Sequence, residues 1–293
     1  MSPSSTQTQP TTAADLGGAS VGLVHPTLKV TVPKRRRIRL SDLWTSRHVG
    51  FMLGLRDIKA KYKQSALGPL WLVLQPLGML AAVSIAFSKV TTVNTGGVPY
   101  ITFALVGLAV WTYVQMAITV APQVLQANYQ VVRRSPCPRL AFVTGTLVSV
   151  LPPLAVVLTA SIVAAGISGT LSAQALAMPI LVAWLLLSTF GFTLLVTALG
   201  GRFRDAVAMA PLVVQAGIFL TPVGYPLSAV PGSFAKVLAL NPVSGVIEAW
   251  RWSLLGIAPD GFAVVVALVA TLVVTVLGWY VFGRMETRFS DYV

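Results

Sequence analysis

Positions 140–201 of this 293-residue chain contain no charged side chain. A water-soluble domain exposes charged residues along a segment of this length, whereas a helix that crosses a bilayer needs about 20 consecutive apolar residues. The segment is long enough to cross twice, and Gly166-Ile167-Ser168-Gly169 in its middle is typical of a turn. The mean hydropathy is +0.79 and only 10% of all residues are charged, so we expect an all-α integral membrane protein.

The basic residues indicate membrane topology rather than binding to nucleic acid. The net charge is +13, and all but three of the 21 lysines and arginines lie in segments 29–63, 133–139, 202–204 and 284–288. Positive charge gathers on the cytoplasmic flanks of membrane spans. The pattern predicts that both termini are cytoplasmic and that anionic membrane lipids contact the basic segments.

Six membrane spans place all four basic segments on one side, and an odd number of spans would not. Pro152-Pro153 is expected to kink the third span. The predicted spans are 69–88, 100–125, 140–165, 176–199, 206–223 and 262–282.

Residues 1–33 are rich in Ser, Thr and Pro and predict a disordered cytoplasmic tail, which leaves one membrane domain over 34–293. In 40–56, apolar residues recur every three or four positions, which predicts an amphipathic helix on the cytoplasmic surface or, alternatively, an ordinary packed helix. Segment 224–257 is apolar but cut by prolines. We expect two short helices that meet at Asn241-Pro242 and re-enter the membrane from outside, with a surface loop as the alternative.

Several motifs, in this order, resemble those of ABC-2 type permeases that export polysaccharides. Residues 55–71 with Gln75-Pro76 resemble their amino-terminal signature, and Arg202-Phe203-Arg204-Asp205 resembles their loop before the fifth span. A resemblance to the external re-entrant helices of these permeases lies in 221–226, Asn241-Pro242, Glu248 and Arg251. The likeness extends over residues 40–290 and is greatest to Wzm-type subunits, which export lipid-linked O-antigen or galactan, and to teichoic acid exporters.

The resemblance implies a homodimer that works with two copies of a cytoplasmic ABC ATPase. The cargo would be a lipid-pyrophosphate-linked polysaccharide, and the location the inner membrane of a bacterium. No lysine follows a glycine in this chain, so a P-loop is absent from it. We therefore expect no enzyme activity and no cofactor in this chain, with ATP and Mg bound by the partner ATPase.

The candidate site residues form three groups. Charged residues near the predicted inner boundary are candidates for ATPase coupling, although the arginines would also serve as topology signals. Aromatic and amide side chains within the spans are candidates for lining a glycan channel, although most such aromatics pack or anchor. The coupling group is Arg56, Asp57, Lys59, Arg133, Arg134, Arg139, Arg202, Arg204 and Asp205; the channel group is Trp71, Gln75, Trp111, Tyr113, Gln115, Trp184 and Gln215; an external gate group is Tyr225, Asn241, Glu248 and Arg251.

Other functions stay open from the sequence. The chain could be an ABC-2 permease for teichoic acid, a drug or a small lipid. A secondary transporter or channel would place ionisable residues within its spans, which the sequence does not show clearly. A membrane enzyme would need paired carboxylates or a metal cluster, whereas the eight acidic residues are scattered singly. The Glu248–Arg251 pair is open between a structural ion pair and a contact with the cargo.

Overall fold

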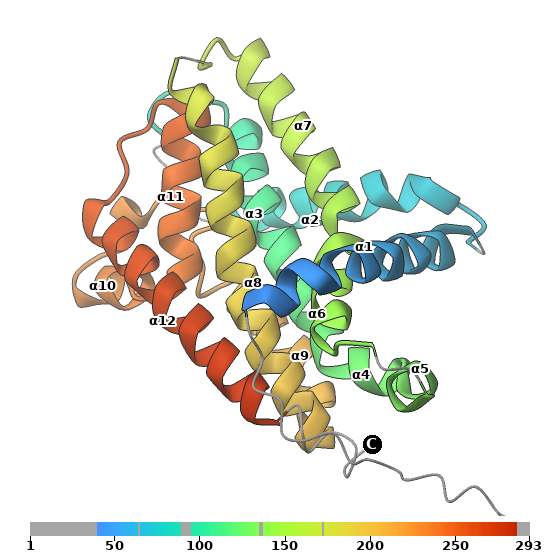
Figure 1. Cartoon of the computed structure of the whole chain (residues 1–293). Helices are drawn as coiled ribbons and strands as arrows, with labels where there is room; N and C mark the ends of the chain where they lie inside the picture. Colours follow the sequence, from blue (N-terminus) through green and yellow to red (C-terminus); the bar gives the residue numbers. More distant parts are fainter. Residues whose placement is uncertain (1–39, 64, 89–94, 135–136, 172, 286–293) are drawn as a thin grey trace, which may run out of the picture. The chain divides into compact units, whose positions relative to one another are not determined.

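The computed structural model describes residues 40–63, 65–88, 95–134, 137–171 and 173–285, and their regular secondary structure is helical (Figure 1). The tail predicted over 1–33 lies outside the described residues. The α-helices are α1 (Leu40–Lys63), α2 (Trp71–Ser88), α3 (Tyr100–Val120), α4 (Val124–Ala127), α5 (Tyr129–Arg134), α6 (Leu140–Ser149), α7 (Leu151–Ile167), α8 (Met178–Arg202), α9 (Arg204–Gly217), α10 (Ser233–Ala239), α11 (Pro242–Leu255) and α12 (Gly261–Met285).

Within the described residues, five helical segments are long and apolar enough to cross a membrane. They correspond to predicted spans one to four and six. These segments are Gly68–Ile85, Tyr100–Ala127, Leu140–Ile167, Ala173–Arg202 and Gly261–Met285.

The fifth predicted span, 206–223, does not form one long helix. Helix α9 has 14 residues and ends at Gly217, and turns follow it as far as Tyr225. At 1.5 Å per residue α9 is about 21 Å long, which is short of the roughly 30 Å of hydrocarbon in a bilayer. Pro222 cannot continue a helix because it lacks an N–H group. The count of six spans therefore stays a prediction.

The third span is interrupted as its prolines predict. Helix α6 ends at Ser149, and Val150 (φ −102°, ψ 3°) separates it from α7. Pro152 and Pro153 occupy the first turn of α7, where their missing N–H groups leave no intrahelical bond unmade. The two halves therefore form separate helices within one apolar segment.

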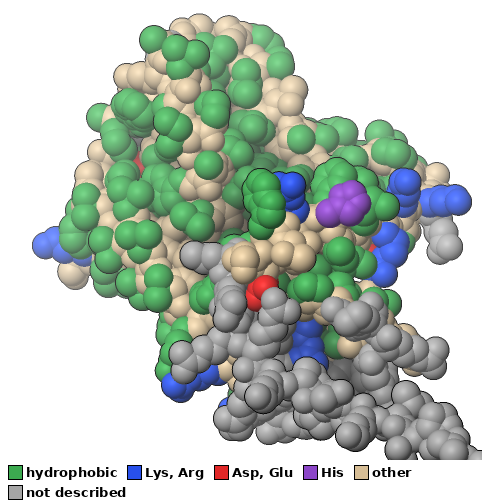
Figure 2. Space-filling view, in the orientation of Figure 1, with side chains coloured by type: hydrophobic (Ala, Val, Ile, Leu, Met, Phe, Trp, Pro, Cys, Tyr) green, Lys and Arg blue, Asp and Glu red, His purple; other side chains and the backbone are tan. Residues whose placement is uncertain are grey.

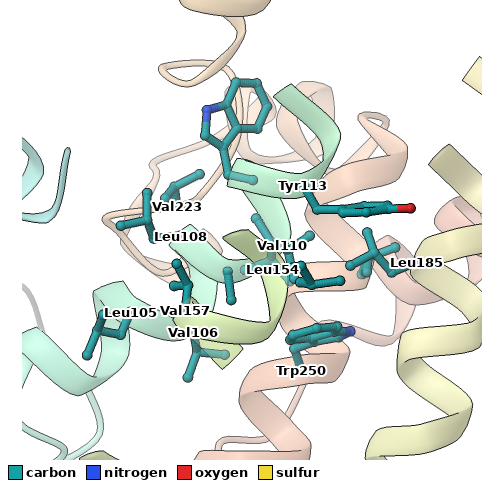
Figure 3. Close-up of a cluster of buried hydrophobic side chains, with 14 of the residues drawn as sticks. Leu105, Val106, Leu108, Val110, Tyr113, Leu154, Val157, Leu185, Val223 and Trp250 are labelled. Carbon is teal, nitrogen blue, oxygen red and sulfur yellow. The ribbon is translucent and has the colours of Figure 1, made fainter. Parts of the chain in front are cut away.

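Helix α3 is the most enclosed of the candidate spans. It packs against α2, α7, α8, α9 and α11, and its side chains from Thr102 to Val114 are buried. Figure 3 shows Tyr113 of α3 beside Leu154 of α7 and Leu185 of α8, with Trp250 of α11 below them. The other candidate spans expose apolar side chains, whereas α3 forms the core that positions its neighbours.

Helix α1 packs against α6 through small residues. Ser46, Gly50 and Gly54 are buried, and a Cβ atom added at Gly54 would lie 2.6 Å from Val148 and 2.9 Å from the Gly145 carbonyl oxygen. Small residues four positions apart let two helices approach closely. We call this contact the α1–α6 seam.

The opposite side of α1 carries the predicted apolar stripe, and its Trp44, Phe51 and Met52 are exposed. Helix α1 extends to Lys63, beyond the predicted end at 56. These apolar side chains can contact lipid, whereas the side of α1 that carries Ser46, Gly50 and Gly54 contacts α6. The position of α1 at the membrane surface stays a prediction.

Two helices meet at Asn241-Pro242, as expected for 224–257. The side chain of Asn241 caps α11 by accepting a hydrogen bond from the Val243 backbone N–H at 3.0 Å, and Pro242 opens the helix. Helix α11 is buried between α3, α8 and α12. Its re-entry into the membrane stays a prediction.

Figure 2 shows hydrophobic side chains spread over the face that includes α8 and α12, with Lys and Arg side chains at its margins. Helix α12 contributes many of the exposed apolar residues, among them Val265, Leu272 and Val276. Such a surface in water would be unusually apolar, whereas in a bilayer it replaces lipid–lipid contacts at no cost.

Candidate functional site

A pocket of about 310 Å³ lies between α2, α3, α9 and the turn that follows α9. Its volume is near the lower limit of about 300–1,000 Å³ that is typical of small-molecule sites. Apolar side chains line most of it, and the polar residues that line it are Trp111, Gln115 and Gln215. No charged residue lines it. We call it the α2–α3–α9 pocket.

Trp111 lines this pocket and carries a buried, unsatisfied hydrogen-bond donor. Its side chain is 5% exposed, and its Nε1–H has no acceptor in the described part of the chain. An N–H group buried without an acceptor costs about 1–3 kcal/mol. Trp111 lies about 16 Å along α3, near the middle of the candidate span, where bulk water is absent.

The structure brings together three of the seven predicted channel residues. Trp111 and Gln115 are one turn apart on α3, and Gln215 faces them from α9. Their pairing across two helices depends on the tertiary packing. The chemistry of the group is uncharged, with one donor from indole and donors and acceptors from two amides.

The other four predicted channel residues lie elsewhere. Trp71 and Gln75 are exposed on α2. Tyr113 is fully buried and its hydroxyl donates to the Leu147 carbonyl oxygen at 3.3 Å. Trp184 donates from Nε1 to the Thr271 hydroxyl at 2.9 Å, which joins α8 to α12. In this structure Tyr113 and Trp184 pack between helices.

Two of the predicted gate residues, Tyr225 and Asn241, lie in or contact the turn 218–226, which forms part of the pocket wall. Asn241 donates from Nδ2 to the Leu220 carbonyl oxygen at 3.0 Å and to the Thr221 hydroxyl at 2.8 Å. Tyr225 donates from its hydroxyl to the Phe219 carbonyl oxygen at 2.9 Å. These contacts are within the protein and hold the turn against the start of α11.

Glu248 and Arg251 form a buried ion pair on α11. Arg251 Nη1 lies 3.5 Å from Glu248 Oε1, and the two side chains are 1% and 8% exposed. The Asp260 backbone N–H also donates to Glu248 Oε2 at 3.4 Å. The placement favours the structural ion pair of the two interpretations, because both charged groups are enclosed by protein.

The predicted coupling residues lie on three separate segments. Arg56 Nη2 is 2.7 Å from Asp57 Oδ1 and donates at 2.7 Å to Asn128 Oδ1, next to α4. Lys59 is exposed on α1. Thus Arg56, which also pairs with Asp57, connects α1 to the segment that the sequence predicts to be the first inner loop.

The remaining coupling residues fall into two places. Arg202, Arg204 and Asp205 are exposed where α8 passes into α9. Arg139 is half-buried at the start of α6, and the side chains of Arg133 and Arg134 lie outside the described residues. The role of these residues in docking stays a prediction.

Sequence reasoning missed several residues that support the site. Asn128 accepts the Arg56 hydrogen bond, and Tyr100 donates from its hydroxyl to the Gly224 carbonyl oxygen at 2.9 Å. Phe103 lies 3.6 Å from the Arg251 guanidinium carbon, measured to the ring centroid. No motif marks these residues, because each acquires its partner only through tertiary contacts.

Residues 50–255, more than half of the chain, match the family model described as ABC-2 type transporter. The chain belongs to the ABC-2 type transporter family. It is 24% identical to the O-antigen export system permease protein RfbA of Klebsiella pneumoniae over 239 residues, which cover 80% of this chain and 91% of that protein. It is 25% identical to the protein of the same name from Myxococcus xanthus over 213 residues, 72% of this chain and 81% of that protein.

Membership confirms the resemblance seen in the sequence. Together with the five apolar helical segments, it identifies a multi-pass membrane protein and a transport subunit rather than a catalytic enzyme. The family match begins within α1 and ends with α11, and so includes the pocket and the Glu248–Arg251 pair.

Proposed function

We propose that this chain is the permease subunit of an ATP-driven exporter that moves a lipid-pyrophosphate-linked polysaccharide, of the galactan or O-antigen kind, across a bacterial inner membrane. Two such permeases pair and bind two cytoplasmic ABC ATPases, which hold ATP and Mg. The relatives' names as O-antigen export permeases support the cargo class.

The observation that carries this proposal is the uncharged polar group Trp111, Gln115 and Gln215 in one pocket at mid-span. Sugar hydroxyls both donate and accept hydrogen bonds, and aromatic rings pack against the apolar faces of sugars. A pocket without a charged group suits the neutral glycan rather than the pyrophosphate. The weak, uncharged contacts would hold each sugar without trapping it.

In the proposed mechanism, ATP binding closes the ATPase pair and pulls on the inner loops near Arg56 and 126–139. The two permeases part along their interface and a continuous path opens through the membrane. The lipid-linked head enters from the inner leaflet beside α1 and the basic residues, and the glycan follows. The six-span arrangement with both termini cytoplasmic, and the re-entry of α10 and α11, belong to this proposal.

Reconstitution tests the function. The purified permease and its ATPase are placed in vesicles that carry lipid-linked glycan on the outer leaflet, and glycan sequestered in the lumen is measured with a lectin. ATPase-driven sequestration of the glycan, absent with an ATPase that cannot hydrolyse ATP, is expected. Transport of a small lipid or a drug, with no transport of the glycan, would instead identify the alternative member of the same family.

A further inference from the structure

The buried side chain of Arg251 contacts the part of the turn that forms one wall of the α2–α3–α9 pocket. Arg251 Nη2 donates to the Val223 carbonyl oxygen at 2.7 Å, and Nη1 donates to the Tyr225 carbonyl oxygen at 3.3 Å. Between them, Tyr100 holds the Gly224 carbonyl oxygen. Three consecutive carbonyl groups therefore accept hydrogen bonds from side chains of α11 and α3.

These contacts determine which surface the turn presents to the pocket. Val223 and Gly224 line the pocket, while their carbonyl oxygens are directed to Arg251 and Tyr100. Figure 3 shows Val223 beside Leu108 of α3. The wall is thus apolar because its backbone acceptors are engaged on the other side.

One side of α3 serves both the arginine and the pocket. Phe103 stacks on the guanidinium, and a Cβ atom added at Gly107 would lie 3.1 Å from Arg251 Nη2 and 2.5 Å from the Val223 carbonyl oxygen. One and two turns further on, Trp111 and Gln115 line the pocket. Residues four positions apart share a helix face, so displacement of Val223 would be felt next to Trp111.

We infer that Arg251 is a positioning residue for the pocket: it fixes the carbonyls of Val223 and Tyr225, and so sets the pocket's shape without touching the transported molecule. The inference rests on the proposed function for the identity of that molecule. Arg251 is 1% exposed, so a direct contact with cargo would require it to leave its partners. A planar fork of donors reaches two carbonyls and Glu248 together, which a lysine ammonium cannot do.

Cysteine alkylation tests this inference without transport. In full-length Cys137→Ser protein in mild detergent, Val223→Cys reports on the wall, and Val157→Cys, 1% exposed in the core, reports on global opening. The rate of reaction with N-ethylmaleimide is measured for each. Adding Arg251→Gln is expected to raise the rate at Val223→Cys by at least about tenfold, since hydrogen bonds from a charged donor are lost. The rate at Val157→Cys is expected to rise much less, because breaking the buried pair weakens the whole fold but releases the wall directly.

Two further variants define the effect. Arg251→Lys also loosens the wall, and Tyr100→Phe, which releases only the Gly224 carbonyl, gives a smaller increase. Lys236→Gln, a matched change of an exposed cation on α10, leaves the rate unchanged. The export rate of Arg251→Gln is expected to fall, while the amount of permease in the membrane stays the same.

The inference is overturned if Val223→Cys stays protected in Arg251→Gln, whether or not export falls, because Arg251 then does not hold the wall. It is equally overturned if the rate at Val157→Cys rises by the same factor as the rate at Val223→Cys, because Arg251 then supports the whole core and not the wall in particular. Since alkylation needs no cargo, a wrong substrate assignment would leave these rates as expected and change only the transport result. If Arg251→Gln cannot be purified, the same two alkylation rates are measured in Tyr100→Phe. A faster reaction at Val223→Cys than at Val157→Cys would support the inference, and an unchanged rate at Val223→Cys would overturn it.

Discussion

Arg56 of α1 donates a hydrogen bond to the side-chain oxygen of Asn128 over 2.7 Å, although the two residues are 72 positions apart. Asn128 in turn donates to the Val124 carbonyl oxygen at 2.8 Å, so the contact reaches the backbone of α4. Gln126 on the same short helix donates to the Gly200 carbonyl oxygen of α8 at 3.0 Å. A displacement of segment 124–128 would therefore reach α1 and α8 together.

We predict that Arg56→Ala lowers export and the stimulation of ATP hydrolysis by the permease, while the melting temperature stays the same. The pair is exposed, so its contribution to stability is at most about 1 kcal/mol. Lys63→Ala, at an exposed cation on the same helix, is the matched control. Normal coupling in Arg56→Ala would show that the contact with Asn128 transmits nothing.

The α1–α6 seam should not tolerate a larger side chain. Gly54→Leu would place atoms against Val148 and the Gly145 backbone and is expected to destabilise the protein by about 1–3 kcal/mol, as overpacking does. Gly78→Leu in α2 is the control, because a Cβ atom there meets nothing within 4 Å. Thermal unfolding in detergent compares the two variants. Equal melting temperatures would mean that α1 is not packed on α6.

Removing the donor of Trp111 tests whether the cargo uses it. Trp111→Phe keeps an aromatic ring but removes Nε1–H, and export should fall by about three- to tenfold if the cargo accepts one net hydrogen bond of roughly 0.5–1.5 kcal/mol. Gln115→Leu and Gln215→Leu are expected to act in the same direction. Gln123→Leu, at an exposed amide away from the pocket, should export normally. An unchanged rate in all three pocket variants would remove the pocket from the path.

Loss of the Glu248 carboxylate should destabilise the fold more than loss of an exposed one. Glu248→Ala leaves the Arg251 charge buried beside fewer acceptors, and breaking a buried pair costs about 3–5 kcal/mol. Asp205→Ala, at an exposed acid, is expected to change stability by less than about 0.5 kcal/mol. Melting temperatures in the same detergent provide the comparison, and similar values would contradict the structural role of the pair.

Cys137 should react slowly with maleimides at neutral pH. Burial raises the pKa of its thiol, and only the thiolate is the nucleophile, so less of the reactive form is present at pH 7 than in an ordinary thiol. The alkylation rate should therefore continue to rise at a pH where the rate of a small reference thiol has levelled off. Mass spectrometry of the intact protein follows the reaction. A rate equal to that of the reference thiol at every pH would contradict the expected shift.

Cys137 also tests orientation, because it lies in segment 133–139, which the sequence predicts to be on the inner side. In intact cells an impermeant maleimide is expected to leave it unmodified, whereas inverted membrane vesicles should be labelled. Labelling in intact cells would place this segment outside and reverse the predicted topology.

The membrane class and the position of most elements could be predicted because hydrocarbon imposes a local rule: about 20 apolar residues make one span. The break before Pro152 and the cap at Asn241 follow from local chemistry in the same way. The apolar run predicts a fifth span that continues to Val223, whereas helix α9 ends at Gly217. Composition alone does not show where a helix ends within an apolar run. The apolar stripe of α1 does not predict that Gly50 and Gly54 on another side pack against α6, a close contact that small residues permit.

The sequence by itself determined that this protein lies in a membrane, that it belongs to its family, and which uncharged polar residues are available to line a path for a glycan. What only the tertiary structure decided was which of those residues meet. Trp111, Gln115 and Gln215 share a pocket, whereas Tyr113, two positions from Trp111, faces the opposite way into the core. The physical reason is that spans are apolar all round, so their composition does not show which side of a helix faces lipid and which faces another helix. That choice depends on contacts between segments distant in the chain, such as Arg251 with Val223.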